Sequence, residues 1–318
     1  MKCSHCGEQL TPNAKFCFEC GTRIAVCVAC GINQAAQGSD RCAKCALEDP
    51  NPTLLFSNNP QIGIHDFQSQ MVPQGCAITE YSGTDKNPTL PASMNGVPVI
   101  AIARECFEGR LLNGVNFPNS IREIADWAFP DNYITKLSLP SQVTYIGMCA
   151  FRCNRLTTLV CPSHLKKIDQ QSFEYNRLEK IAFPTALDYI GKSAFSYNRL
   201  ATVVIPDGTN FIGEQAFSYN EITSLSLPKS LMFLGVEAFA YNQLTELTIP
   251  SGLHEIPEGA FSFNKLTSLT IPTSVTSIDK HAFLNNQLSA VTVPASVELH
   301  PNAFDKWVEI TRVKFESA

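Results

Sequence analysis

Apolar and polar positions repeat every 22 residues over most of this chain. Phenylalanine marks the period in ten successive units, and only the last interval is shorter, at 21 residues. These residues are Phe107, Phe129, Phe151, Phe173, Phe195, Phe217, Phe239, Phe261, Phe283 and Phe304. Proline keeps the same step nine times, from Pro118 to Pro294. A period this strict predicts a solenoid, in which each unit buries its apolar edge against its neighbours.

One unit shows the elements that the pattern predicts. Leu247 and Ile249 are two residues apart, so they share a face of a short strand. Pro250 ends that strand because it has no N–H to donate. A second apolar pair then crosses the far side of the coil, and the chain turns at Phe261 with at most one helical turn. Coils stacked at about 4.8 Å would pair these strands in parallel and align the phenylalanines in an inward column.

Asparagine forms a second column, three residues after the phenylalanine, from Asn132 to Asn286. We expect each amide to point inward and to bond backbone groups of its own and the adjoining coil. A row of amides that binds a ligand is the alternative. Glycine recurs before the phenylalanine, for example at Gly147 and Gly191, but the same slot holds Pro257. Since proline fixes φ near −65°, this slot does not require a positive φ.

This repeat resembles the BspA-like leucine-rich repeat family over about residues 75–318. The resemblance includes a longer first coil, "AITEYSGTDKNPTLPASMNGVPVIAI". It implies a mainly β repeat solenoid, right-handed, with 22-residue coils and short parallel strands. In that family the asparagine column is often cysteine, whereas here it is asparagine throughout.

The C-terminal end of the repeat predicts a closing strand. Ile310, Val313 and Phe315 reproduce the spacing of the strand residues without the proline. Charged residues between them, such as Arg312 and Lys314, would protect the open edge of that strand from further pairing.

Eight of the thirteen cysteines lie in the first 45 residues, in four Cys-x2-Cys pairs. Two such pairs supply four thiolates in the tetrahedral arrangement that Zn²⁺ prefers. We therefore predict two structural Zn²⁺ sites with closed four-cysteine shells. Their ligands are Cys3, Cys6, Cys17, Cys20, Cys27, Cys30, Cys42 and Cys45. Sequential pairing is favoured, and interleaved pairing of the same cysteines stays open.

The segment "CSHCGEQLTPNAKFCFECG" resembles the zinc-ribbon family. The resemblance implies a double zinc ribbon, with one ribbon over residues 1–22 and a second over 23–46. A linker rich in proline and asparagine follows over 47–74, and the solenoid occupies 75–318. Whether the ribbons recognise a partner or only cap and stabilise the chain is an open alternative.

Charge argues against nucleic acid as the first choice of partner. The net charge is −5, and only 17% of the residues are charged. Eight thiolates and two Zn²⁺ bring the slightly basic head to about −2, which does not attract phosphate. The N-terminal "MKCSHCGEQL" lacks the apolar core of a signal peptide. We therefore expect a cytoplasmic protein whose thiols stay reduced.

Three sets of residues are candidates for the surface that binds a protein partner. The first set consists of hydroxyl side chains that point outward from the strands, and these either are simply solvated or form a recognition face. Its members are Thr223, Ser226, Thr245, Thr248, Thr267 and Thr270. The second set consists of arginines that lie one coil apart, Arg155, Arg177 and Arg199. Either Glu174, Glu179 and Glu221 neutralise their charge, or the arginines bind an acidic ligand. Aromatic residues two positions after the phenylalanines, from Tyr175 to Phe263, either pack at a corner or anchor a partner.

Nothing in the sequence indicates an enzyme or a small-molecule substrate. Cys161 and His164 are close in sequence, but Cys161 occupies an inward strand slot, where it acts as a small apolar residue. The sequence therefore predicts a non-catalytic cytoplasmic interaction module or scaffold. The alternatives are a nucleic-acid-associated regulator that binds through the zinc ribbons, and a surface-associated protein exported by a non-classical route.

Overall fold

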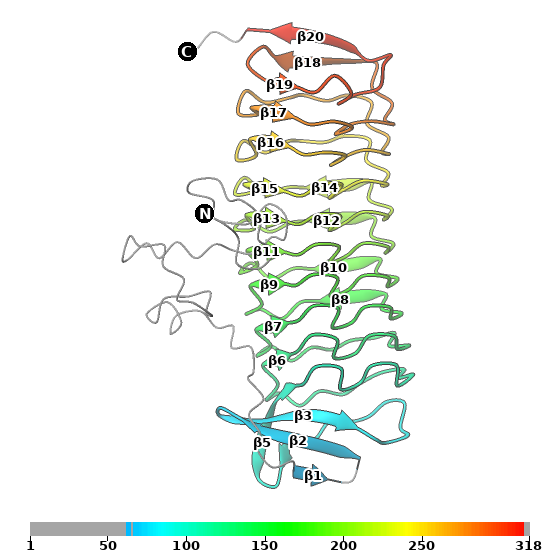
Figure 1. The fold of residues 1–318 in the computed structure, drawn as a ribbon, viewed down its shortest axis with the longest axis vertical. Coiled ribbons are helices and arrows are strands. Elements are labelled where there is room, and N and C mark those ends of the chain that lie inside the picture. The colour runs from blue at the N-terminus through cyan, green and yellow to red at the C-terminus, as the bar shows by residue number, and fades with distance from the viewer. Residues whose placement is uncertain (1–61, 65, 315–318) are drawn as a thin grey trace, which may run out of the picture. The chain divides into compact units, whose positions relative to one another are not determined.

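The computed structural model of the chain describes residues 62–64 and 66–314. The predicted zinc ribbons, with all eight proposed zinc ligands, lie outside the described residues, as does the first part of the predicted linker. The chain divides into two compact units, Met1–Leu55 and Phe56–Ala318. The second unit is a mainly β solenoid whose coils stack one on another from the blue to the red end of the chain (Figure 1).

An antiparallel meander begins the solenoid. It consists of β1 (Ile62–Ile64), β2 (Phe67–Val72) and β3 (Gly75–Tyr81), with β2 paired to both neighbours. β3 then pairs in parallel with β5 (Val97–Ile102), and β4 (Ser93–Met94) adds to β5 in the antiparallel direction. The meander therefore joins directly to the first parallel coil.

β1 and β2 lie within residues 47–74, which the sequence predicts as a linker. The solenoid unit thus starts earlier than predicted. The reason is visible in β2, where Ser69 is fully buried while its neighbours Gln68 and Gln70 are half-buried. A strand that buries a serine shows no apolar alternation in its sequence.

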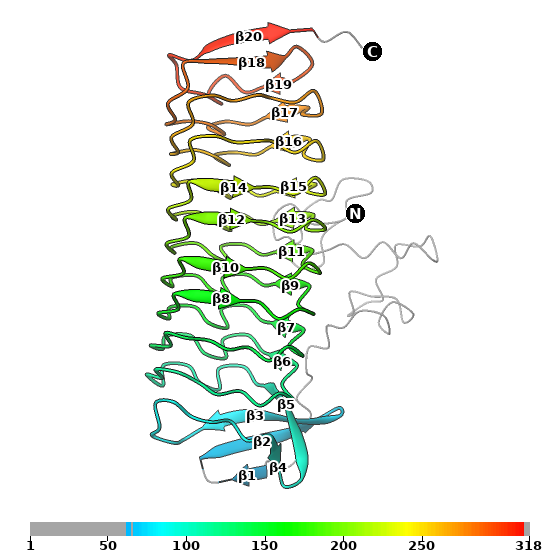
Figure 2. The same ribbon diagram turned by 180° about the vertical axis from the view of Figure 1, so that it is seen from behind.

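The coils contribute strands to two ladders on opposite sides of the stack, and some coils have a strand only in the second ladder (Figures 1 and 2). The first ladder contains β8 (Thr158–Val160), β10 (Lys180–Ala182), β12 (Thr202–Val204), β14 (Ser224–Ser226), β18 (Ala290–Pro294) and β20 (Glu309–Val313). The second contains β6 (Glu123–Ile124), β7 (Tyr145–Ile146), β9 (Lys167–Ile168), β11 (Tyr189–Ile190), β13 (Phe211–Ile212), β15 (Phe233–Leu234), β16 (Glu255–Ile256), β17 (Ser277–Ile278) and β19 (Glu298–Leu299).

Pairing within the ladders is parallel and in step with the repeat. Tyr189 lies opposite Phe211 and Ile190 opposite Ile212, one coil further on. The second ladder is the more continuous one, because β5 to β15 belong to a single sheet whereas the first ladder is broken into two-stranded pieces. The predicted return across the far side of the coil is therefore the main sheet of the solenoid.

The phenylalanines form the predicted inward column. Successive rings from Phe107 to Phe304 stack with centroids 4.7–5.8 Å apart and interplanar angles of 1–14°. All are buried, and Tyr81 continues the column at its N-terminal end. Offset stacking of this kind adds to the free energy that each ring gains by leaving water.

Left-handed backbone occurs twice in nearly every coil, two residues before and two residues after the phenylalanine. Trp127 and Asp131, for example, flank Phe129 with φ of 57° and 55°. This conformation turns the N–H groups of Trp127, Phe129 and Asp131 toward the next coil, where they donate to three carbonyls at 2.8–3.0 Å. The left-handed residues therefore extend the hydrogen bonding between coils through the turn.

Each asparagine amide joins two coils, as predicted. In Asn220, Oδ1 accepts a hydrogen bond from the Leu200 N–H of the preceding coil at 3.0 Å. Its Nδ2 donates to the Phe195 carbonyl of that coil at 2.9 Å and to the Phe217 carbonyl of its own coil at 3.2 Å. The amide thereby satisfies backbone groups that would otherwise be buried without partners.

Recurrent glycine is explained by close contact between coils and not by φ. Gly191 and Gly213 have ordinary φ values, as predicted, but a Cβ on Gly213 would lie 2.6 Å from the Lys192 backbone nitrogen. On Gly191 it would lie 2.7 Å from the Gln170 nitrogen. The sequence did not reveal this constraint, because other coils hold proline or aspartate in the same slot.

β20 closes the solenoid, but in a different register from the predicted one. Ile310 pairs with Val291, whereas a 22-residue step would have aligned it with Leu288. Arg312 does not simply guard the edge, because its guanidinium donates to the carbonyls of Pro294 and Val297 at 3.3 and 2.7 Å. The last coil is therefore shorter than the others.

Removing one amide from the asparagine column should weaken the whole stack. We expect Asn220→Ala to lower the free energy of unfolding by about 3 kcal/mol or more, because several buried backbone groups lose their partner. Chemical denaturation measures this. The control is Glu221→Ala at the adjacent exposed position, which should change stability by no more than about 0.5 kcal/mol. Equal stability of the two variants would contradict the role assigned to the amide.

Candidate partner-binding surfaces

The six predicted hydroxyl residues form one surface, here called the hydroxyl face. Its members lie at two equivalent slots in three successive coils and all are exposed, and they are Thr223, Ser226, Thr245, Thr248, Thr267 and Thr270. The hydroxyl of Thr223 also donates to the Ala201 carbonyl of the preceding coil at 3.2 Å. In earlier coils the slot of Ser226 holds Val160 and Val204, which are 69% and 62% exposed. The face thus continues along the first ladder, where the exposed Lys180 of β10 interrupts it with a charge.

A second surface is a column of stacked rings at the corner after the phenylalanine turn, here called the aromatic column. It consists of Tyr175, Tyr197, Tyr219, Tyr241 and Phe263. Neighbouring ring centroids are 4.2–4.5 Å apart, with interplanar angles of 6–14°. The ring faces are therefore covered by one another, while the four residues other than Tyr241 remain 37–42% exposed through their edges and hydroxyls.

The backbone does not require aromatic side chains in the aromatic column. Gly109, Asp131 and Asn285 occupy the same slot of other coils with φ of 55–61°, and Asp131 makes the same bond to the next coil as Tyr197 does. Left-handed φ costs a bulky residue roughly 1–2 kcal/mol, and stacking returns about 0.5–1.5 kcal/mol. Stacking of the rings therefore contributes little net free energy to folding. The stability of the fold does not explain why aromatic side chains with exposed edges occupy this slot.

Tyr219 in the aromatic column keeps its phenol proton. Loss of hydration, together with the neighbouring Tyr241 and Tyr197 hydroxyls, raises the pKa of Tyr219 to about 12. The column therefore offers a partner hydrogen-bond donors at neutral pH.

Three exposed arginines lie beside the aromatic column and are here called the arginine column. They are Arg155, Arg177 and Arg199, and each follows an inward asparagine. The Arg155 guanidinium lies 4.0 Å from the ring centroid of Tyr133, which occupies the same slot one coil earlier. That contact was missed in the sequence, although the 22-residue step places Tyr133 directly in line.

Glu174 does not neutralise the arginine column, as the sequence had suggested. Its carboxylate is 8% exposed and binds Arg152 Nε at 2.6 Å, with further bonds from Gln171 Nε2 at 3.0 Å and Ser196 Oγ at 3.2 Å. Arg152 in turn lies 5.3 Å from the Tyr175 ring centroid, at the N-terminal end of the aromatic column. Among residues 66–314, no ion pair involves an arginine of the arginine column.

Within residues 66–314, the placement of candidate metal ligands and the burial of two cysteines bear on catalytic and metal chemistry. No three His, Cys, Asp or Glu side chains in this range are placed to hold a metal ion. Burial raises the pKa of the Cys161 thiol to about 12, and that of Cys149 also to about 12, so neither supplies a thiolate at neutral pH.

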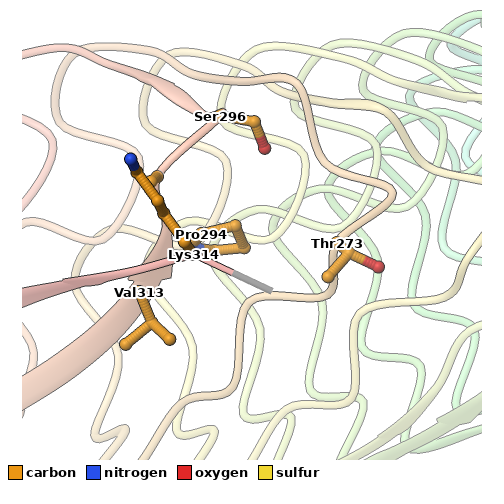
Figure 3. Close-up of a pocket in the computed structure, with 6 residues that line it drawn as sticks. Thr273, Pro294, Ser296, Val313 and Lys314 are labelled. Atoms are coloured by element: carbon orange, nitrogen blue, oxygen red, sulfur yellow. The ribbon is translucent and has the colours of Figure 1, made fainter. Parts of the chain in front are cut away.

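A small cavity of about 290 Å³ lies at the C-terminal end of the solenoid, beside β18 and β20 (Figure 3). Thr273, Pro294, Ser296 and Val313 line it, with Lys314 as the charged residue of the lining. Its volume is at the lower limit of ligand pockets, and it offers no pair of groups that could act as acid and base.

Comparison with protein families decides the assignment of the repeat. The model of the BspA type leucine rich repeat region matches residues 89–202 and 188–311, which together cover more than half of the chain. The chain belongs to the BspA-type leucine-rich repeat family. The zinc-ribbon domain model matches residues 2–24 of this BspA-type protein, which supports the first of the two predicted ribbons.

Solved structures of leucine-rich repeat and related proteins match the chain at 17–20% identity, and the one with a TM-score above 0.5 shows the fold alone. A leucine-rich repeat protein from Bacteroides ovatus has a TM-score of 0.52 at 19% identity, over 74% of this chain and 66% of that one. A leucine rich cell surface protein from Faecalibacterium prausnitzii gives 0.43 at 20% identity, covering 82% and 96%. Pneumococcal vaccine antigen PcpA gives 0.49 at 17% identity, covering 80% and 88%. No curated protein matches the chain.

Within residues 62–64 and 66–314 there is no helix with the length and apolar character needed to cross a bilayer.

Glu123 is a carboxyl group on the second ladder whose pKa is shifted by its surroundings. It is half-buried on β6, between Ala101 of β5 and Tyr145 of β7. Burial raises the pKa of its carboxyl from 4.5 to about 7. The protonated form is therefore the one that the folded repeat favours.

Stability of the BspA-type repeat should fall as pH rises through the pKa of Glu123. A raised pKa in the folded state contributes stability that is complete below pH 4.5 and is lost as pH passes about 7. We expect Glu123→Gln to remove that slope, which amounts to no more than about 3 kcal/mol. Denaturation at several pH values measures it. The control is Glu255→Gln in the same slot of β16, where the side chain is exposed and the slope should persist.

Proposed function

We propose that this chain is a non-catalytic interaction module of the cytoplasm, in which a double zinc ribbon precedes a BspA-type solenoid that binds a protein partner through the hydroxyl face. The observation that carries the proposal is the composition of that face. Over residues 223–270 its outward side chains are short, exposed and almost entirely uncharged.

Burial of such a face against a partner costs little. Threonine and serine lose less side-chain entropy on ordering than long charged residues do, and their hydroxyls can donate or accept hydrogen bonds. Cores of protein interfaces are depleted in charged residues, and here Glu246 is the exception in the three coils. The exposed Val160 and Val204 would extend the contact with apolar area.

The absence of catalysis and the cytoplasmic location belong to the proposal and have their own support. The buried Cys161, with its raised pKa, and the small cavity beside β18 and β20 offer no nucleophile or acid–base pair. The five cysteines of the described range are free thiols, as expected in a reducing compartment. No observation on these residues favours the alternative of a nucleic-acid regulator.

Positive charge placed on the hydroxyl face should abolish binding of its partners. We expect Thr245→Lys combined with Thr267→Lys to lose the proteins that the wild-type chain retains in quantitative affinity purification. The matched control is Thr144→Lys with Thr276→Lys, because these exposed threonines lie beside the second ladder and add the same charge. Retention of the same partners at full yield by the first variant would exclude the hydroxyl face.

Zinc content tests the proposed head of the chain. We expect two Zn²⁺ per purified chain by native mass spectrometry, as four-cysteine sites require. With sequential pairing, Cys3→Ser with Cys17→Ser damages one site and leaves one Zn²⁺, whereas Cys3→Ser with Cys27→Ser damages both. The reverse result would establish interleaved pairing, and a metal-free wild-type chain would exclude the zinc ribbons.

A further inference from the structure

The aromatic and arginine columns meet at one corner of the solenoid. Tyr175 and Arg177 are two residues apart, and so are Tyr197 and Arg199, with an inward asparagine between the members of each pair. The corner therefore presents phenol edges and guanidinium groups next to each other in successive coils. It is separate from the hydroxyl face, which shares none of these residues.

The arginines at this corner form no ion pair among residues 66–314, although Arg155 lies over the Tyr133 ring. Glu174 is committed to Arg152, and Glu179 and Glu221 form no ion pair among residues 66–314. Successive coils hold the arginines close enough to repel one another, in a chain whose net charge is −5. An external anion would relieve that repulsion.

We infer that this corner binds an acidic segment of another polypeptide, laid along the stack of coils. Its carboxylates would pair with the arginines, whose planar guanidinium groups bind carboxylate through two parallel hydrogen bonds. The tyrosine hydroxyls would add hydrogen-bond donors, and the exposed ring edges would contact apolar side chains of the same segment.

Single-stranded nucleic acid fits this corner less well, although arginine and aromatic residues also occur in its binding sites. Bases stack on ring faces. Here the faces between neighbouring rings are covered at 4.2–4.5 Å, and Arg152 lies over the outer face of Tyr175, so within the stack only the outer face of Phe263 is left without a ring or guanidinium over it. The rings thus offer edges and hydroxyls, which suit a peptide.

Binding of a fluorescein-labelled peptide of alternating glutamate and leucine to the full chain tests the inference by fluorescence anisotropy. We expect binding at low salt that weakens as salt is added. Arg177→Ala with Arg199→Ala should raise the Kd on the order of tenfold. The control, Lys166→Ala with Lys229→Ala, removes the same charge from exposed positions outside the corner and should change the Kd by less than about twofold.

A second variant separates the rings from the arginines. Tyr197→Asn with Tyr219→Asn should raise the Kd about fivefold, and the fold should tolerate it because Asn285 occupies the same slot with φ of 57°. The inference is overturned if the wild-type chain does not bind the peptide at low salt, or if the lysine control loses as much affinity as the arginine variant. Tighter binding of oligodeoxythymidylate than of the peptide would also overturn it, and would assign the corner to nucleic acid.

Discussion

Hydrogen bonding between coils is the constraint on which this solenoid depends, and the asparagine amides complete it. The ladders pair backbone groups along the two sides of the stack, but the corner after each phenylalanine leaves buried groups that no strand can reach. Asn220 fills that gap by bonding Leu200 and Phe195 of one coil and Phe217 of the next. Since each corner needs the amide of its neighbour, a single coil has no complete set of partners, and order must extend from coil to coil.

Because the hydrogen bonds between coils are made by the backbone, the side chains on the surface of the turn can differ from coil to coil. Left-handed residues two positions from each phenylalanine bond the next coil through their backbone, so Asp131 and Tyr197 serve the fold equally well. The side chain at such a slot is then available for other tasks, although the left-handed φ costs glycine, asparagine and aspartate less than it costs tyrosine. This explains how one scaffold carries an aromatic column in its middle coils and small polar residues at its ends.

Repetition made the interior predictable and left the ends unpredictable. The phenylalanine and asparagine columns, the parallel pairing and the turn after each proline all follow from the 22-residue step. The first strands were missed because β2 buries Ser69 where an apolar residue would be expected, and β20 was misaligned because the last coil is shorter. At an end of the stack only one neighbour constrains a coil, so its sequence is no longer bound to the common pattern.

By itself, the sequence determined the length of the coil and which side chains face inward, because these depend on a period that is written in the order of residues. It also marked the exposed hydroxyl, tyrosine and arginine positions. Only the tertiary structure decided which charges meet, placing Glu174 on Arg152 and leaving Arg177 and Arg199 without an ion pair among residues 66–314. The physical reason is that ion pairing depends on distances of a few ångströms between side chains of different coils, which a repeat period does not specify.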